Sequence, residues 1–143
     1  MNHAETVIRV LIVDDNALAV EALQRWMHSL HDMVLVGWAT DVESALSIAA
    51  RESPDLVFLD LDIPGVETLV LLARLRSEPL SLRVVMFSGH ISTSSIDRSL
   101  DAGAIGYISK DEPTALIAAL AKRAARGEFV LSPLVQKSYL GGE

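Results

Sequence analysis

The sequence predicts an α/β fold in which five helices flank a doubly wound parallel sheet of five strands. Two observations support this prediction: short apolar runs recur along the chain, and segments with helical spacing of apolar residues alternate with them. Buried parallel strands have nearly continuous apolar runs because helices cover both faces of their sheet. The chain has 143 residues, the size of one ordinary domain, and a chain of this length buries about two-thirds of its unfolded surface.

The first predicted strand covers residues 7–13 (VIRVLIV) and stops at two consecutive aspartates. The other predicted strands are similar runs at residues 33–38, 56–59, 84–87 and 105–108. Between and after these strands, apolar residues three or four positions apart form the buried stripe of a helix. The five stripes begin at Leu18, Val42, Leu69, Ile96 and Leu116. We expect both tryptophans, Trp26 and Trp38, to lie in the core.

The alternation of strands and helices ends near the C-terminus, so we predict a globular domain over residues 1–127 and a linker over residues 128–143. Within the linker, Ser132 followed by Pro133 indicates an N-cap and a first-turn proline, which predicts a short helix through about Tyr139. The polar tail that ends in glycines is typical of a connection to a further domain.

The composition argues against several functions. The net charge is −7, from 12 Lys and Arg against 19 Asp and Glu, so this chain alone is expected to bind nucleic acid poorly. The absence of cysteine excludes disulfides, thiolate metal sites and a cysteine nucleophile, and it suits a reducing cytoplasm. No apolar stretch has membrane-spanning length, so we expect a cytoplasmic protein without membrane contact.

The chemically informative residues stand at or just after the ends of the apolar runs, because ligands of open parallel sheets bind beyond the carboxyl ends of the strands. They are Asp14, Asp15, Asp60, Ser88 and Lys110. Clustered carboxylates repel one another unless a cation neutralises them, and Mg²⁺ suits oxygen ligands. One carboxylate can then attack phosphorus to give an aspartyl phosphate, while an ammonium and a hydroxyl stabilise the phosphoryl oxygens. Each residue alone would more commonly cap a helix, but all five at strand ends favour a site.

Four motifs together resemble the receiver domain of two-component response regulators. They are Val13-Asp14-Asp15-Asn16, Asp60-Leu61-Asp62-Ile63-Pro64-Gly65, Phe87-Ser88-Gly89 and Gly106-Tyr107-Ile108-Ser109-Lys110. The resemblance covers roughly residues 7–126, so it implies that residues 1–127 are a receiver domain with the flavodoxin-like (CheY-like) fold. It also implies that a sensor histidine kinase phosphorylates this domain.

The resemblance implies a role for each matched residue. Asp60 is the phosphoacceptor. Asp15, Asp60 and the backbone carbonyl of Asp62 hold Mg²⁺, and Asp14 assists through water. Ser88 and Tyr107 take the places of the switch residues, and Lys110 takes the place of the family's lysine. Tyr107 either turns inward when Ser88 moves toward the phosphoryl group or is a fixed core aromatic with its hydroxyl at the surface; the resemblance favours the first.

Two further phrases, residues 102–107 and 127–133, are similar to the NarL/FixJ group, whose members carry a LuxR-type helix-turn-helix domain. This similarity implies control of transcription through a C-terminal DNA-binding domain that the sequence lacks, with DNA reached only through that domain. We also expect a homodimer, through the face made by the fourth helix, fifth strand and fifth helix or through another receiver surface.

Two residues depart from the family's pattern. Asp62 adds a fourth carboxylate near the phosphoacceptor; it either changes the Mg²⁺ requirement or the aspartyl-phosphate lifetime, or it points outward as a solvated charge. Thr68 stands where the family often has glycine, so we expect a different entry to the third helix.

Two other functions stay open. One is a stand-alone receiver that acts by docking to a protein. The other is a haloacid-dehalogenase-like phosphatase, because Asp60-Leu61-Asp62 matches the start of its DxD motif. That motif prefers Thr or Val where Pro64 stands, and its further acidic pair follows the nucleophile instead of preceding it.

Overall fold

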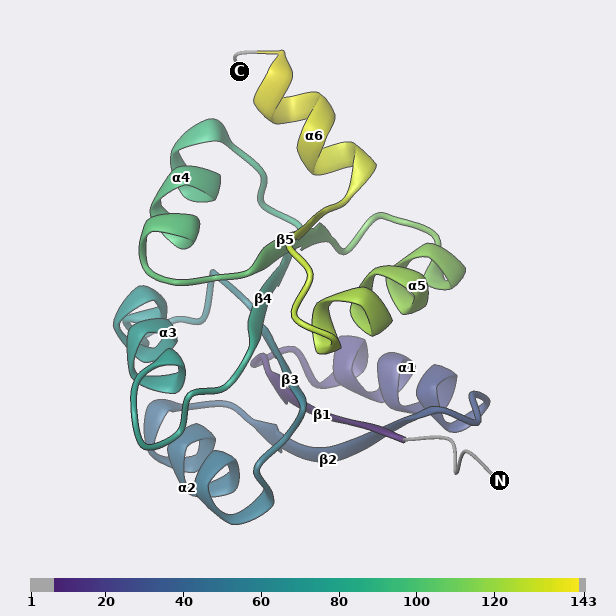
Figure 1. Ribbon diagram of the computed structural model, residues 1–143, viewed down its shortest axis with the longest axis vertical. Coiled ribbons are helices and arrows are strands. Elements are labelled where there is room, and N and C mark those ends of the chain that lie inside the picture. The colour runs from purple at the N-terminus through teal and green to yellow at the C-terminus, as the bar shows by residue number, and fades with distance from the viewer. Residues whose placement is uncertain (1–6, 142–143) are drawn as a thin grey trace.

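A single parallel sheet forms the centre of the computed structural model, which describes residues 7–141 (Figure 1). Its strand order is β2-β1-β3-β4-β5-β6, and every neighbouring pair is parallel. The strands are β1 (Ile8–Val13), β2 (Met33–Ala39), β3 (Leu56–Leu59), β4 (Val84–Ser88), β5 (Gly106–Ser109) and β6 (Val130–Leu131). The predicted five-stranded parallel sheet is confirmed, and β6 is a short strand beyond the prediction.

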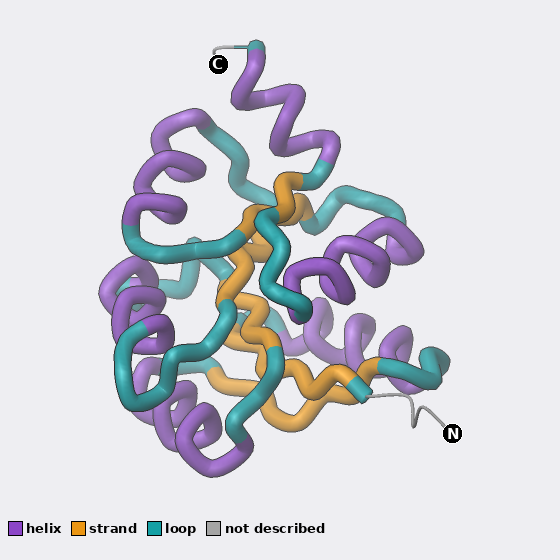
Figure 2. The backbone as a smooth tube through the Cα atoms, viewed as in Figure 1, coloured by secondary structure: helices purple, strands orange, loops and turns teal. Residues whose placement is uncertain are grey.

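Helices cover both faces of the sheet, as the continuous apolar strands require. Helices α2, α3 and α4 lie on one face, and α1 and α5 lie on the other (Figures 1 and 2). The helices are α1 (Ala17–His28), α2 (Val42–Glu52), α3 (Thr68–Arg76), α4 (Thr93–Asp101), α5 (Thr114–Ala125) and α6 (Pro133–Leu140). The part of the chain that the structure describes contains no helix long and apolar enough to cross a membrane.

The core has two halves, one on each face of the sheet. Successive side chains of a strand point to opposite faces, so β1 contributes Leu11 and Val13 to the half under α2, α3 and α4, and Val10 and Ile12 to the half under α1 and α5. All four are at most 1% exposed. This double burial holds the carboxyl ends of the central strands in fixed positions relative to one another.

The helix starts explain how the loops leave the carboxyl ends of the strands. The side chains of Asn16, Asp41 and Ser92 cap α1, α2 and α4 by accepting a backbone N–H in the first turn. The start of α3 differs, because no side chain caps it. Instead, the Thr68 hydroxyl donates to the carbonyl of Leu61 at 2.8 Å, which ties the first residue of α3 back to the end of β3.

The segment after α5 packs on the domain. Strand β6 pairs with β5, and a Cβ atom at Gly106 would lie 2.6 Å from the carbonyl oxygen of Val130, so this close pairing requires glycine in β5. The short helix predicted after Ser132 is present as α6, with Ser132 at the N-cap position. The role of residues 128–143 as a linker stays a prediction, and residues 142–143 lie outside the described part of the chain.

Four contacts attach α6 to the rest of the domain. Val135 is fully buried. The Ser132 hydroxyl accepts the N–H of Ser109 at 3.1 Å, and a carboxylate oxygen of Glu112 accepts the N–H of Leu134 at 2.8 Å. The Tyr139 hydroxyl donates to Asp97 of α4 at 2.7 Å.

The tryptophan prediction is half correct. Trp26 is partly buried and packs against the core under α1 and α5. Trp38 is 39% exposed at the end of β2, so the expectation that it is a core residue is wrong. Strand β2 is an edge strand of the sheet, and one side of its last residues therefore faces solvent.

Candidate functional site

Three carboxylates meet beyond the carboxyl ends of β1 and β3. These strands are adjacent, with Val13 paired to Leu59, so Asp14 and Asp60, the next residues, lie side by side. Asp14, Asp15 and Asp60 each offer one oxygen, and the three oxygens lie within 4.8 Å of one another. We call these residues the acidic cluster. Asp14 is 1% exposed and Asp60 is 8% exposed, whereas Asp15 is open to solvent.

Lys110 supplies the positive charge of the site. It follows β5, and its ammonium group donates to Asp14 Oδ2 at 2.7 Å and to Asp60 Oδ2 at 3.3 Å. The ammonium nitrogen also lies 5.9 Å from the centre of the Phe87 ring, a distance that allows a cation–π contact. One lysine thus bridges the two buried carboxylates, although β4 separates its strand from the strand that precedes Asp60.

The pKa values indicate that the single ammonium of Lys110 does not offset the negative charge of Asp14 and Asp60. Burial, and then the negative charge of Asp14, raise the pKa of Asp60 to about 6 against an ordinary value of 3.8, while Lys110 and the Asp62 backbone N–H oppose the rise. Burial alone would lower the pKa of Lys110, but its hydrogen bond to Asp14 and the charges of Asp60 and Asp14 outweigh burial and raise it. The Lys110 ammonium therefore stays charged, and further positive charge at the site would be favourable.

The acidic cluster fits a hard divalent cation. Its donors are carboxylate oxygens, which Mg²⁺ and Ca²⁺ prefer, and these oxygens lie within 4.8 Å of one another beyond the ends of two adjacent strands. Asp15 is on the solvent side, so a cation that it binds could retain water and exchange it for a phosphate oxygen. A cation here would also relieve the repulsion that raises the pKa of Asp60.

Ser88 and Tyr107 both contact His90 in the loop after β4. The Ser88 hydroxyl accepts the N–H of His90 at 2.9 Å, and the Tyr107 hydroxyl donates to the His90 carbonyl at 2.6 Å. Tyr107 is fully buried, and burial raises its pKa. Tyr107 therefore points inward. Its hydroxyl is buried, in contrast to the alternative from the sequence that placed it at the surface.

Asp62 contributes its backbone to the site while its side chain is exposed. Its N–H donates to Asp60 Oδ1 at 3.3 Å. Its side chain lines a polar surface cavity of about 390 Å³ together with Thr68, His90 and Ser92. The exposed side chain accords with the alternative in which it points outward, whereas its effect on phosphoryl chemistry stays a prediction.

The structure adds Trp38 to the surroundings of the acidic cluster. The indole N–H of Trp38 donates to the backbone carbonyl of Asp14 at 2.7 Å. Sequence reasoning missed this contact because a tryptophan at the end of an apolar run is more typical of a core. The informative signal is its place at the carboxyl end of a strand, the same end from which the site residues emerge.

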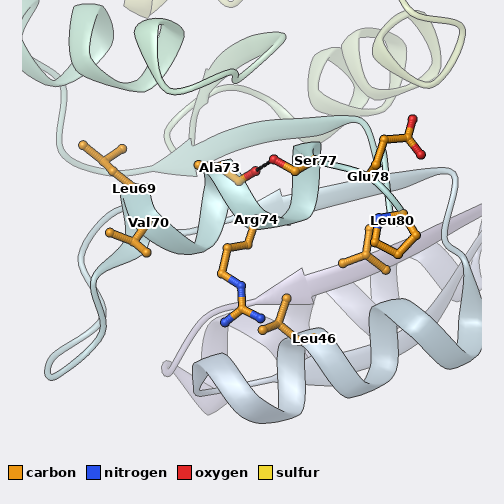
Figure 3. A pocket seen from close by; sticks show the side chains of 9 residues that line it. Leu46, Leu69, Val70, Ala73, Arg74, Ser77, Glu78 and Leu80 are labelled. Atoms are coloured by element: carbon orange, nitrogen blue, oxygen red, sulfur yellow. Dashed lines mark hydrogen bonds between the residues drawn. The ribbon is translucent and has the colours of Figure 1, made fainter.

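A second cavity, of about 490 Å³, lies on a different part of the molecule between α2 and α3 (Figure 3). Its lining includes Leu46 of α2 and Leu69, Val70 and Arg74 of α3, with Leu80 beyond that helix. In Figure 3 the Arg74 side chain extends toward Leu46. No residue of the acidic cluster lines this cavity, so it is separate from the site described above.

A parallel sheet with carboxylates and a lysine gathered at its carboxyl edge is the arrangement of a receiver-type signalling switch. The chain matches the family of response regulator receiver domains over residues 10–121, and it belongs to that family. Receivers of this family interact with sensor histidine kinases. Family membership removes the support for a haloacid-dehalogenase-like phosphatase.

Comparison with individual proteins relates the chain to NarL-type response regulators of two-component signalling. The nitrate/nitrite response regulator protein NarL of Escherichia coli (strain K12) is 37% identical over 124 residues, which are 86% of this chain and 57% of that protein. The probable transcriptional regulatory protein NarL of Mycobacterium tuberculosis is 30% identical over 135 residues, which are 94% of this chain and 61% of that protein. The chain thus spans about three-fifths of the length of these relatives.

Solved structures show the same architecture. The signal receiver domain of the putative response regulator NarL from Mycobacterium tuberculosis has a TM-score of 0.80 at 29% identity, over 86% of this chain and 99% of that one. A LuxR-family two-component response regulator from Aurantimonas sp. SI85-9A1 has a TM-score of 0.87 at 23% identity, over 95% of this chain and 97% of that one. At that identity the second likeness concerns the fold alone.

Proposed function

We propose that the chain accepts a phosphoryl group on Asp60 from a sensor histidine kinase. The observation that carries this proposal is the buried carboxylate of Asp60, within reach of a second and a third carboxylate and hydrogen-bonded to Lys110. Mg²⁺ would be held by Asp15, Asp60 and the backbone carbonyl of Asp62, with Asp14 assisting through water. When bound, this ion would neutralise the phosphoryl oxygens and align them for transfer.

The chemistry assigned to the chain's own residues is a phosphoryl transfer. A carboxylate oxygen of Asp60 attacks the phosphorus of the phosphohistidine, a P–O bond forms, and the P–N bond to the imidazole breaks. Lys110 already lies between Asp14 and Asp60, and its ammonium would hydrogen-bond a phosphoryl oxygen. Ser88 would supply a second hydrogen bond from its hydroxyl.

The proposed switch lies in the loop between β4 and α4. The aspartyl phosphate would carry a charge of about −1.5 to −2 where the free carboxylate carries −1, and Ser88 would turn its hydroxyl toward it. That hydroxyl now accepts the His90 N–H, and Tyr107 binds the carbonyl of the same residue. A movement of Ser88 would therefore release one of two contacts that hold His90, and the face of α4, β5 and α5 would change.

The test of the proposed function is phosphorylation with a small-molecule phosphodonor. Wild-type protein is incubated with acetyl phosphate and Mg²⁺ and then analysed by intact-protein mass spectrometry. We expect one added phosphoryl group on the wild type and none on Asp60→Asn. The matched control is Asp55→Asn, which changes an aspartate that precedes β3, at the opposite end of the strand from Asp60, and this variant should still be phosphorylated. An unmodified wild type, or equal modification of Asp60→Asn, would contradict the proposal.

The output that we propose is control of transcription through a separate DNA-binding domain. The names of the NarL relatives support this proposal, and so does their greater length. Dimerisation through the face of α4, β5 and α5 would have to accommodate α6, because β6 lies along β5 and Tyr139 of α6 contacts α4. A stand-alone receiver that docks to another protein stays the alternative, and the cytoplasmic location stays a prediction.

A further inference from the structure

We infer that Trp38 is a positioning residue for the acidic cluster: its indole N–H fixes the peptide between Asp14 and Asp15 and thereby sets where the Asp15 carboxylate points. The inference rests on the proposed function, since it concerns the same site and its cation. It assigns to Trp38 a part in cation binding without direct contact to the cation.

Four hydrogen bonds use every polar group of Asp14. Its N–H donates to the Ala39 carbonyl at 3.0 Å, and its carbonyl accepts the Trp38 indole at 2.7 Å. Its Oδ1 accepts the N–H of Asn16 at 2.9 Å, and its Oδ2 accepts the Lys110 ammonium at 2.7 Å. Asp14 is 1% exposed, so water could not easily replace any of these partners.

The Trp38 contact begins where the strand pairing stops. The registered pairs of β1 and β2 end at Val13 and Ala39. The N–H of Asp14 still donates to the Ala39 carbonyl, but its carbonyl takes its donor from the Trp38 side chain. A buried carbonyl without a donor costs about 1–3 kcal/mol in general, so this indole N–H satisfies a group that would otherwise be expensive to bury.

The rigidity of the peptide carries this contact to Asp15. The six atoms from Cα of Asp14 to Cα of Asp15 lie in one plane, so a hydrogen bond on the Asp14 carbonyl also fixes the start of the Asp15 side chain. Asp15 is the exposed member of the acidic cluster. The other two members are buried and bridged by Lys110, so Asp15 depends most on its backbone for its position.

The exposure of Trp38 indicates that packing is not its main contribution. It is 39% exposed on an edge strand, a costly place for a large aromatic residue. Trp26, by contrast, packs against the core. Trp26 is therefore the matched control, because its replacement removes an indole of the same size that has no part in the site.

The test measures Mg²⁺ binding by titration calorimetry on folded protein, as judged by circular dichroism. We expect Trp38→Phe, which keeps an aromatic ring but removes the N–H, to raise the Mg²⁺ dissociation constant about tenfold, the lower end of effects seen for outer-shell partners of metal ligands. Trp26→Phe should leave the constant unchanged. In acetyl phosphate reactions, Trp38→Phe should need more Mg²⁺ for half-maximal rate, whereas lost stability alone would not shift that concentration.

A second measurement does not depend on the folding of Trp38→Phe. In Trp26→Phe, Trp38 is the single tryptophan of the chain, and its emission should change as Mg²⁺ saturates the site. Wild-type affinity in Trp38→Phe, or unchanged Trp38 emission while calorimetry records Mg²⁺ binding, would overturn the inference. A wild type that binds no Mg²⁺ and accepts no phosphoryl group would instead contradict the proposed function.

Discussion

At the scale of single residues, the site is defined by an excess of buried negative charge. Asp14 and Asp60 share the one ammonium of Lys110, and the pKa of Asp60 rises to about 6 because burial and the charge of Asp14 disfavour its ionised form. The ionised carboxylate that the proposed phosphoryl transfer needs therefore lowers the stability of the cation-free fold.

This cost predicts that Asp60→Asn stabilises the cation-free protein at neutral pH. The folded state binds the Asp60 proton more tightly than the unfolded state does, so the ionised carboxylate destabilises the fold at pH 7, and the penalty disappears as the pH falls below about 4. We expect Asp60→Asn to raise the free energy of unfolding at pH 7 by about 1 to 3 kcal/mol, the upper figure being the full linkage of the pKa shift. Urea denaturation in EDTA measures this difference.

The pH series supplies the control for that prediction. The advantage of Asp60→Asn over the wild type should shrink from pH 7 to pH 4, and saturating Mg²⁺ should also reduce it by stabilising the wild type. A gain that stays constant with pH would mean that the carboxylate charge is not its cause.

At the scale of secondary-structure elements, α4 buries two serines on the face that it turns to the core. Ser95 and Ser99 are both buried on this helix, together with Ile96. The Ser95 hydroxyl is hydrogen-bonded to Ser92, whereas Ser99 has the one buried side-chain polar atom without a partner among the described residues. Because α4 follows the loop that contains His90, a weakly held α4 suits a helix that is proposed to move.

The unpartnered hydroxyl predicts that Ser99→Ala stabilises the protein. Removal of a buried hydroxyl that makes no hydrogen bond should raise the free energy of unfolding by about 1 kcal/mol. Ser95→Ala is the matched control and should lower it, because this change removes a buried hydroxyl that is hydrogen-bonded to the Ser92 hydroxyl. Thermal or chemical denaturation of the two variants measures both changes in stability. A loss of stability in Ser99→Ala would show that the Ser99 hydroxyl has a partner in solution.

Sequence patterns revealed the elements whose signal is local. Continuous apolar runs indicated the five long strands, and the rule that ligands lie beyond their carboxyl ends brought Asp14 and Asp60 together. Strand β6 was not predicted, because a strand of two residues shows no periodicity. Its pairing depends on the open edge of β5 and on Gly106. The hydrogen bond from Tyr107 to His90 and the indole contact of Trp38 were also not predicted, because each depends on the backbone of a segment distant in sequence.

At the scale of the whole molecule, residues 128–141 complete the sheet and the core. Strand β6 covers the edge of β5, and the buried side chains of Val130 and Val135 belong to the core. The predicted boundary after residue 127 would therefore remove structure from the domain as well as a connection.

This arrangement predicts that a protein ending at Gly127 is less stable than the whole chain. The loss of Val130 and Val135 alone should lower the free energy of unfolding by at least about 2 kcal/mol, and the uncovered edge of β5 should promote association. Thermal denaturation and size-exclusion chromatography of proteins ending at Gly127 and at Gly141 measure both effects. Equal melting temperatures would show that β6 and α6 contribute nothing to the fold.

The two backbone anchors of the tail have a practical consequence. The N–H of Ser109 donates to the Ser132 hydroxyl, and the Glu112 carboxylate accepts the N–H of Leu134 in the first turn of α6. Ser109 and Glu112 flank Lys110 in the sequence. A protein fused beyond Leu140, such as a fluorescent protein, would be connected through these contacts to the short segment that carries Lys110, the lysine that binds Asp14 and Asp60. A biosensor for the proposed phosphorylated state is therefore best attached at this end of the chain.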